Sequence, residues 1–353
     1  MKKFLQKYHI ENKKIAVGVS GGADSLALVL MAAEQLVPCG YRVIALTVDH
    51  GLRPSSADEA AYVAEIMKQH QIEHHILRWQ GEKPQSDVEA AARTARFELI
   101  GEWCQQNEVS CLLLAHHSYD QAETFFIRLQ RGSGLEGLCA MREAVKRHNL
   151  LILRPLLNRS PEDMKNYLRQ KKIAWINDES NDDERFLRNK IRHFLPELAQ
   201  KTAITAEDIC QTVTRLQSAE DYIQNKLAQF MATEVVNESG EIFYLNYAVF
   251  AKLHEEMQFR VLARLLGDEY MPRAGSVLRL RQQLLAPNFN GATLNGKEIL
   301  RHNEQIWIVP EFSVKHKAYK AEWKEFIKHN PQYKRHKLPF KVKFALVQMW
   351  RKK

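Results

Sequence analysis

A glycine-rich stretch between a predicted strand and a predicted helix has residue types that can hold phosphate. Ser20-Gly21-Gly22-Ala23-Asp24-Ser25 follows the apolar run 14–19 and precedes the apolar run 26–33. Two glycines let the backbone approach an anion, and a helix N-terminus adds N–H donors and partial positive charge. The stretch lacks the lysine that G-x-x-x-x-G-K-[ST] loops place on the β and γ phosphates. It therefore predicts a loop that holds pyrophosphate as a leaving group, with serine hydroxyls, backbone amides and Mg²⁺ on Asp24.

Elements of two alternating kinds position this loop. The pattern predicts strands at 14–19, 42–48, 75–79, 111–115 and 150–153, and helices near 25–37, 56–70, 87–106, 119–130 and 161–171. Such alternation predicts an α/β fold with a doubly wound, mainly parallel sheet. Ligands of these sheets bind at the carboxyl ends of the strands. Asp49-His50 and His116-His117 fall at such ends, beside the glycine loop.

The glycine loop resembles the signature of the N-type ATP pyrophosphatases, which cleave ATP between the α and β phosphates and adenylylate a carbonyl-like oxygen. A glycine turn that only closes a strand–helix joint is the structural alternative. The resemblance implies an adenine nucleotide alpha hydrolase-like fold. It also implies ATP contacts for Ser20, Gly21, Gly22, Ala23, Asp24, Ser25, Asp49, His50 and His116.

Motifs beyond this loop resemble one family of that superfamily. They occupy residues 49–56, 89–97, 116–124, 128–134, 154–157, 175–181 and 186–192. Together they resemble the tRNA(Ile)-lysidine synthetases. The resemblance implies a carbon–nitrogen ligase that uses ATP to attach L-lysine to C2 of the wobble cytidine of tRNA(Ile) with a CAU anticodon. An O2-adenylylated cytidine is the implied intermediate, AMP and diphosphate are released, and codon specificity changes from AUG to AUA.

Charged residues between 120 and 131 are candidates for this chemistry. Guanidinium groups should spread the charge that develops on the phosphates, so Arg128 and Arg131 are predicted to act as catalytic residues with Asp24. Asp120 and Glu123, three residues apart, share one face of a helix. The resemblance implies that these two bind the cationic amino groups of lysine. Carboxylates favoured by the dipole of a helix N-terminus are the structural alternative.

The same loop also suits a tRNA thiolation enzyme of this superfamily, which would transfer sulfur to a pyrimidine after adenylylation. The chain has five scattered cysteines and no C-x-x-C pair, which argues against that alternative and against a zinc cluster. A non-catalytic RNA-binding module is a further alternative, but it leaves residues 20–25 without a purpose.

Basic charge is concentrated near the C-terminal end. The formal net charge is +9, and residues 315–353 contain thirteen lysines and arginines against two glutamates. Aromatic residues lie between them: Tyr319, Trp323, Phe326, Tyr333, Phe340, Phe344 and Trp350. Basic residues with interleaved aromatics favour contact with a polyanion that has exposed bases, here tRNA. A solubilising basic tail is the alternative.

The length of 353 residues allows two or three domains. We expect a PP-loop catalytic domain at 1–184, a helical tRNA-binding or linker region at 185–270, and a small α+β region at 271–353. No apolar run of about 18 residues, long enough for a bilayer, occurs, and no signal-peptide segment follows the N-terminal lysines. We therefore expect a cytoplasmic protein without membrane contact. The sequence leaves the oligomeric state open, a homodimer included.

Overall fold

The computed structural model describes residues 1–81, 83–84, 86–147, 149–177, 187–267, 271–312, 319–335 and 338–351. The chain divides into two units, Met1–Glu220 and Asp221–Lys353. The domain boundaries predicted at 184/185 and 270/271 touch segments outside the described residues and stay predictions. Within the described ranges, no helix is long and apolar enough to cross a membrane.

The first unit is built on a six-stranded sheet with the order β3-β2-β1-β4-β6-β5. Its strands are β1 (Lys14–Gly18), β2 (Arg42–Asp49), β3 (Glu73–Arg78), β4 (Cys111–Leu113), β5 (Ala144–Arg147) and β6 (Leu150–Leu153). All neighbours pair in parallel except β5, which runs antiparallel to β6 and was not predicted. The predicted doubly wound, mainly parallel sheet is confirmed. Its order reverses between β1 and β4, which creates the crevice where such sheets bind ligands.

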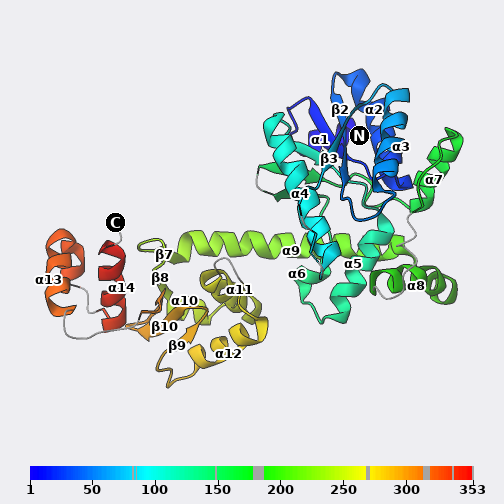
Figure 1. Cartoon of the computed structure of the whole chain (residues 1–353). Helices are drawn as coiled ribbons and strands as arrows, with labels where there is room; N and C mark the ends of the chain where they lie inside the picture. The colour runs from blue at the N-terminus through cyan, green and yellow to red at the C-terminus, as the bar shows by residue number, and fades with distance from the viewer. Residues whose placement is uncertain are drawn as a thin grey trace. The chain divides into compact units, whose positions relative to one another are not determined.

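Helices cover both faces of this sheet (Figure 1). On one face lie α1 (Lys2–Lys7), α2 (Ala23–Leu36), α3 (Ser56–Gln69) and α7 (Pro161–Gln170), and on the other lies α4 (Val88–Gln106). The helices α5 (Ser118–Gln130), α6 (Leu135–Leu138), α8 (Leu187–Thr202) and α9 (Ala206–Glu234) follow, of which α9 continues past Glu220, and a 3₁₀ turn lies at Val37–Cys39. Because side chains alternate along a strand, Ile15 and Val17 of β1 join the core beneath α2, α3 and α7, whereas Ala16 joins the core beneath α4. Side chains of β1 therefore pack in the cores on both faces of the sheet.

A third core fixes the start of α5 at the edge of the crevice. Ala122 of α5 packs with Leu195 of α8 and with Ile209 and Val213 of α9. Since α5 begins five residues after β4 ends, this packing sets the direction in which the residues after β4 point.

The second unit contains a five-stranded antiparallel sheet with the order β7-β8-β11-β10-β9. The strands are β7 (Val235–Asn237), β8 (Phe243–Asn246), β9 (Ala292–Leu294), β10 (Lys297–His302) and β11 (Gln305–Pro310). The helices are α10 (Tyr247–Ala251), α11 (Glu255–Leu266), α12 (Ala274–Leu285), α13 (Tyr319–His329) and α14 (Phe340–Arg351), with a 3₁₀ turn at Pro331–Arg335. Asn295-Gly296, a residue pair typical of two-residue hairpin turns, joins β9 to β10 with φ values of 53° and 71°.

The basic C-terminal segment is folded, and this corrects the role expected of its aromatic residues. Phe326 and Phe344 are only 3% and 8% exposed, and they pack with Trp307 and Val309 of β11. The interpretation that these two phenylalanines stack on exposed bases is therefore wrong. Helical spacing places the rings of these two phenylalanines in the core, so they no longer support the predicted contact with tRNA.

Deletion of the residues after Phe312 is expected to unfold the second unit. The deletion removes α13 and α14 and uncovers Trp307, Val309 and Ile242. Each large apolar side chain that loses burial costs about 1.5–3 kcal/mol, and a whole domain is stable by only about 5–15 kcal/mol. Limited proteolysis should then cleave residues 221–312 rapidly while the first unit survives. Resistance of both units would show that these helices are not part of the core.

Candidate active site

The largest cavity of this site lies at the carboxyl ends of β1 and β2, next to the starts of α2 and α5. Its volume is about 940 Å³, and its polar lining includes Ser20, Asp24, His50, Arg96, His117, Asp120 and Arg192. A chamber of about 220 Å³ adjoins it, with apolar walls from Leu46, Val48, Ile100 and Leu114. Both cavities share Ser20, Gly22, Asp24, Val48 and Arg96. A polar cavity joined to an apolar chamber suits a nucleotide, because its phosphates are charged and its base has apolar faces.

The glycine loop is tied to a segment far along the chain. Gly21 has a φ of 90°, and a Cβ on it would lie 2.6 Å from Cδ1 of Ile176. Ile176 also donates a backbone hydrogen bond to the Gly21 oxygen at 3.0 Å. Both the left-handed backbone and the close approach require glycine here. Gly21 therefore shapes the loop and does not itself line either cavity.

The start of α2 is arranged to receive an anion. Ser25 Oγ accepts from the Ser20 amide at 3.1 Å and donates to the Gly22 oxygen at 3.0 Å, which closes the loop onto the helix. Gly22 is the N-cap and provides no side-chain cap. The first N–H groups of α2 therefore have no capping side chain, and a helix N-terminus in that condition binds phosphate well.

Asp24, in the first turn of α2, has a carboxylate oxygen without a partner. Its Oδ1 is buried and makes no hydrogen bond within the described chain. Its Oδ2 lies 3.5 Å from Nε2 of His117. A buried carboxylate oxygen is costly unless a donor or a cation contacts it. Since Mg²⁺ prefers oxygen ligands, the Asp24 carboxylate fits this ion.

His50 presents a ring nitrogen to the same cavity. Nη2 of Arg96 donates to its Nε2 at 3.2 Å, so a neutral ring carries its proton on Nδ1. That Nδ1 is buried and has no partner among the described residues. Burial, aided by the charge of Arg96, lowers the pKa of His50 to about 4 and keeps the ring neutral. His50 is thus a neutral ring at the cavity, and its buried Nδ1 hydrogen has no acceptor within the described chain.

Asp49, predicted to contact ATP, stabilises the turn that carries His50. Its Oδ1 accepts from the Gly51 amide at 3.0 Å and from the Ser56 hydroxyl at 2.8 Å. Its side chain does not line either cavity. The ATP contact of Asp49 stays a prediction, and the contacts observed for it are those of a loop anchor.

His116 lines the smaller chamber as a second neutral imidazole. Its Nδ1 accepts from Nε of Arg154 at 3.2 Å. Burial lowers its pKa to about 4, because the attraction of Asp120 is too weak to offset burial and the charge of Arg154. The hydrogen on Nε2 is then a donor for a nucleotide in this chamber.

Asp120 and His117 form a charged pair at the start of α5. The His117 amide donates to Oδ2 of Asp120 at 3.0 Å, and Nε2 of His117 lies 3.5 Å from that oxygen. Burial lowers the pKa of His117, but the hydrogen bond to Asp24 and the charge of Asp120 outweigh it and leave the pKa raised. Burial raises the pKa of Asp120, but the charges of His117 and Arg188 and the hydrogen bond from the His117 amide leave the pKa lowered. The cavity therefore contains an ionised Asp120 carboxylate.

Glu123 holds two arginines. Its side chain is 0% exposed, its Oε2 lies 2.7 Å from Nε of Arg188, and its Oε1 lies 2.6 Å from Nε of Arg192. Arg192 lines the large cavity and reaches within 3.5 Å of Asp120, whereas Glu123 does not line it. Glu123 thus positions a guanidinium at the cavity, and its predicted contact with lysine stays a prediction.

Arg128 and Arg131, predicted at the phosphates, lie at the other end of α5. Arg128 is in its last turn and Arg131 is its C-cap, whereas Asp120 is in its first turn. Eight helical residues rise about 12 Å, and neither arginine lines the two cavities. Both residues are exposed. Their catalytic role stays a prediction to which the geometry of the cavity lends no support.

Two arginines to which the sequence analysis assigned no role line the large cavity in their place. Arg96 belongs to an E-x₃-R-x₂-R spacing at 89–96, and Arg192 ends an R-N-x-I-R run at 188–192. Basic residues at helical spacing were the available signal. Which of the many basic residues reach the cavity depends on how α4 and α8 pack, and this is not visible in the pattern.

Comparison with known proteins gives the family. The family model of the PP-loop domain matches residues 1–199. The chain is 35% identical over 311 residues to the tRNA(Ile)-lysidine synthase of Wolbachia pipientis wMel, covering 86% of this chain and 72% of that protein. The chain belongs to the tRNA(Ile)-lysidine synthase family. With the enzyme of that name from Rhodopseudomonas palustris it is 36% identical, over 76% of this chain and 80% of the relative.

Membership of the tRNA(Ile)-lysidine synthase family confirms the resemblance found in the motifs. Among solved structures, the chain is similar to the U34-tRNA thiolase NcsA from Methanococcus maripaludis with its [4Fe-4S] cluster, with a TM-score of 0.53 and 16% identity. That likeness covers 61% of this chain and 76% of the thiolase and shows a shared fold. Burial raises the pKa of the thiols of Cys104, Cys111 and Cys210 to about 12, which disfavours the reactive thiolate.

Proposed function

We propose that the chain ligates L-lysine to C2 of the wobble cytidine of CAU-anticodon tRNA(Ile), with cleavage of ATP to AMP and pyrophosphate. The observation that carries the proposal is one cavity that brings the uncapped start of α2 and Asp24 together with the ionised Asp120. The first pair suits the phosphates of ATP, and the carboxylate of Asp120 suits an ammonium group. The family to which the chain belongs supports the same reaction.

The first step is activation of the base. Cytidine O2 attacks the α phosphorus, the bond to the bridging oxygen breaks, and pyrophosphate leaves with the electron pair. The amides at the start of α2 hold the phosphates, while Arg96 and Arg192 offset the developing charge. The carboxylate of Asp24 would hold Mg²⁺, which polarises phosphate oxygens when bound. The smaller chamber, with the Nε2 hydrogen of His116, suits the adenine.

The second step forms the carbon–nitrogen bond. The neutral ε-amine of lysine attacks C2, the C2–O2 bond breaks, AMP leaves with the oxygen and the electron pair, and the new amine gives a proton to water. Asp120 binds the remaining ammonium of lysine, which orients the ε-amine toward the base. His117 lies between Asp24 and Asp120, with its Nε2 3.5 Å from an oxygen of each. It therefore fixes the distance between the proposed metal site and the proposed lysine site.

Labelled lysine tests the whole proposal. The purified chain is incubated with ATP, Mg²⁺, tRNA(Ile) transcript and radiolabelled lysine. We expect label in the RNA and one pyrophosphate released per lysine attached. Release of pyrophosphate without labelled RNA would mean that the acceptor is another nucleophile, such as the sulfur donor of a thiolation reaction. Absence of ATP cleavage would contradict the enzyme assignment itself.

Binding of tRNA by the second unit is also a proposal, and it rests on exposed lysines. Lys324 of α13 and Lys334 of the following 3₁₀ turn are exposed. We expect Lys324→Gln and Lys334→Gln each to weaken tRNA binding. Each should also lower the slope of log affinity against log salt concentration, by about 0.9 for each phosphate that is no longer neutralised. Lys68→Gln, at an exposed lysine of α3, is the matched control. Identical salt slopes for all three variants would place the RNA elsewhere. A homodimer and a cytoplasmic location stay predictions.

A further inference from the structure

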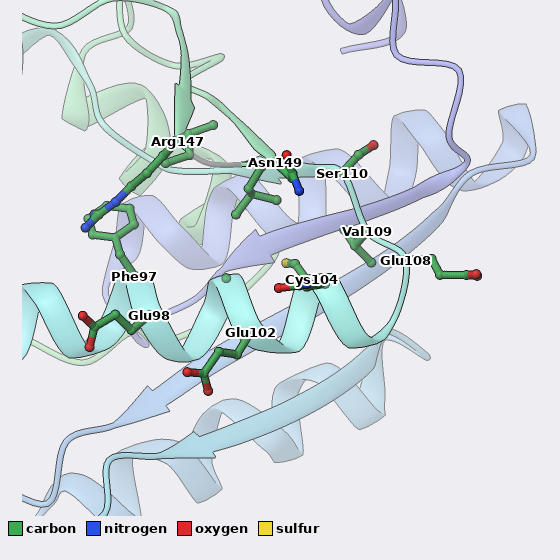
Figure 2. A pocket seen from close by; sticks show the side chains of 13 residues that line it. Phe97, Glu98, Glu102, Cys104, Glu108, Val109, Ser110, Arg147 and Asn149 are labelled. Atoms are coloured by element: carbon green, nitrogen blue, oxygen red, sulfur yellow. The ribbon is translucent and has the colours of Figure 1, made fainter. Parts of the chain in front are cut away.

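A cavity separate from the active site lies at the opposite ends of the strands. Its volume is about 520 Å³. It lies between the C-terminal half of α4, the residues that precede β4, and β6 with the hairpin before it (Figure 2). Val109 and Ser110 lie before the start of β4, whereas the active-site residues follow β1 and β2. None of its lining residues lines the two active-site cavities.

The interior of this cavity is apolar. Its buried lining side chains are Cys104, Val109, Leu150 and Ile152. Phe97 stands at one end, with the guanidinium of Arg147 4.7 Å from the centre of its ring (Figure 2). The remaining lining residues are mostly polar or charged. A concave site of a few hundred Å³ that combines apolar walls with polar groups is of the kind that holds small organic ligands.

A glycine in the middle of α4 opens this cavity. A Cβ added to Gly101 would meet no atom within 4 Å, so neither packing nor backbone conformation requires a glycine there. Glycine inside a helix is less favourable than alanine, because it loses more conformational freedom on folding. The residue therefore costs stability and leaves space in the wall of the cavity.

Two carboxylates flank that glycine. Glu98 and Glu102 are four residues apart and project from the same side of α4 (Figure 2). Like charges at this spacing destabilise a helix, and neither glutamate has an ion-pair partner in the part of the chain that the structure describes. Glu108, a third lining carboxylate, lies 3.5 Å from Nζ of Lys14. Among the described residues that line the cavity, three carboxylates therefore outnumber one positive charge, that of Arg147.

We propose that this cavity binds a small organic cation with an apolar, preferably aromatic, body. The body occupies the space over Gly101 between Phe97 and Leu150, and the ammonium group lies at the rim beside Glu98 and Glu102. Such a ligand uses the apolar walls, fills the space that Gly101 leaves, and relieves the repulsion between the two carboxylates. The proposal is independent of lysine transfer, because it concerns other residues at the other end of the sheet.

Two probes of equal size and opposite charge test this site. The full chain is titrated with phenethylamine and with 3-phenylpropionate, and binding is followed by calorimetry and by NMR of the ligand. We expect the amine to bind about tenfold more tightly at low salt, with a difference that shrinks as salt is added. Saturating ATP and L-lysine should leave amine binding unchanged. Displacement of the amine by lysine, or equal binding of both probes, would overturn the proposal.

Variants of α4 locate the amine. Gly101→Leu should abolish amine binding by filling the cavity, whereas Gly101→Ala should keep affinity within about threefold and raise the Tm of the first unit by about 2 °C. The double variant Glu98→Gln/Glu102→Gln should weaken the amine about tenfold and strengthen binding of the carboxylate probe, because the charges that repel it are removed. Glu65→Gln, at an exposed glutamate of α3, is the control. Full amine affinity in folded Gly101→Leu would contradict this site.

Discussion

Replacement of Asp24 by asparagine is expected to reduce pyrophosphate release by about 10²–10³-fold, the usual effect of losing one group that stabilises transition-state charge. The buried Oδ1 has no partner in the described chain, so the variant loses the charge that a metal would use and no structural hydrogen bond at that atom. At Oδ2 the variant keeps an oxygen or amide beside His117 but loses the charge that raises the pKa of that ring, so His117 should lose its proton at lower pH. Because Asp24 is proposed to contact the phosphates of ATP and not the RNA, tRNA affinity should stay near that of the unaltered chain. Rates are measured by pyrophosphate release over a range of Mg²⁺ concentrations, and tRNA affinity by filter binding.

The control for Asp24→Asn is Asp58→Asn, an exposed carboxylate in the first turn of α3. It shares the position near a helix N-terminus but does not line the cavity. We expect it to release pyrophosphate at the normal rate. If Asp24→Asn also released pyrophosphate within about threefold of normal, the assignment of the metal site to Asp24 would be wrong.

Replacement of Glu123 by glutamine separates two roles for this residue. The neutral amide cannot balance the guanidinium groups of Arg188 and Arg192, which the Glu123 carboxylate contacts at 2.7 and 2.6 Å. Breaking a buried ion pair by removing one partner costs about 3–5 kcal/mol. Because Arg188 and Arg192 are 41% and 31% exposed and are rehydrated in part, we expect a loss of about 2 kcal/mol in the free energy of unfolding. Denaturant titration measures it.

The kinetic effect of Glu123→Gln decides between positioning and lysine binding. If Glu123 positions Arg192, kcat should fall about 100-fold while the KM for lysine stays within about threefold. Asp120→Asn, in contrast, should raise the KM for lysine about tenfold or more. Glu136→Gln, in exposed α6, should change neither parameter. A raised KM for lysine with normal kcat in Glu123→Gln would restore the direct contact that the sequence predicted.

Much of the site could be predicted because its residues are close together in the sequence. Ser20 to Ser25 lie on one loop between β1 and α2, and both elements have strong apolar patterns. Asp120 follows β4 in the same way. In a parallel sheet the residues after each strand meet at one edge, so the order of strands and loops alone predicts their proximity.

Other features depend on how helices pack, and the sequence pattern does not contain that information. Arg128 and Arg192 look alike in the sequence, yet packing of α5 against α8 leaves Arg128 exposed and brings Arg192 to the cavity. The aromatics after residue 319 resembled a stacking surface, but helix formation turned Phe326 and Phe344 into a core. The cavity beside Gly101 could not be predicted from the sequence, because three segments that are separate in the chain form its walls.

By itself, the sequence determined the fold of the first unit and the family and predicted a loop for the phosphates of ATP, because each depends on residues that are adjacent in the chain or separated by regular strand and helix periods. Only the tertiary structure decided which charged groups share the cavity. It placed Arg96 and Arg192 there, left Arg128 and Arg131 at the far end of α5, and buried Glu123 between two arginines. The physical reason is that ion pairs form between side chains brought together by packing, and their distances cannot be read from spacing along the chain.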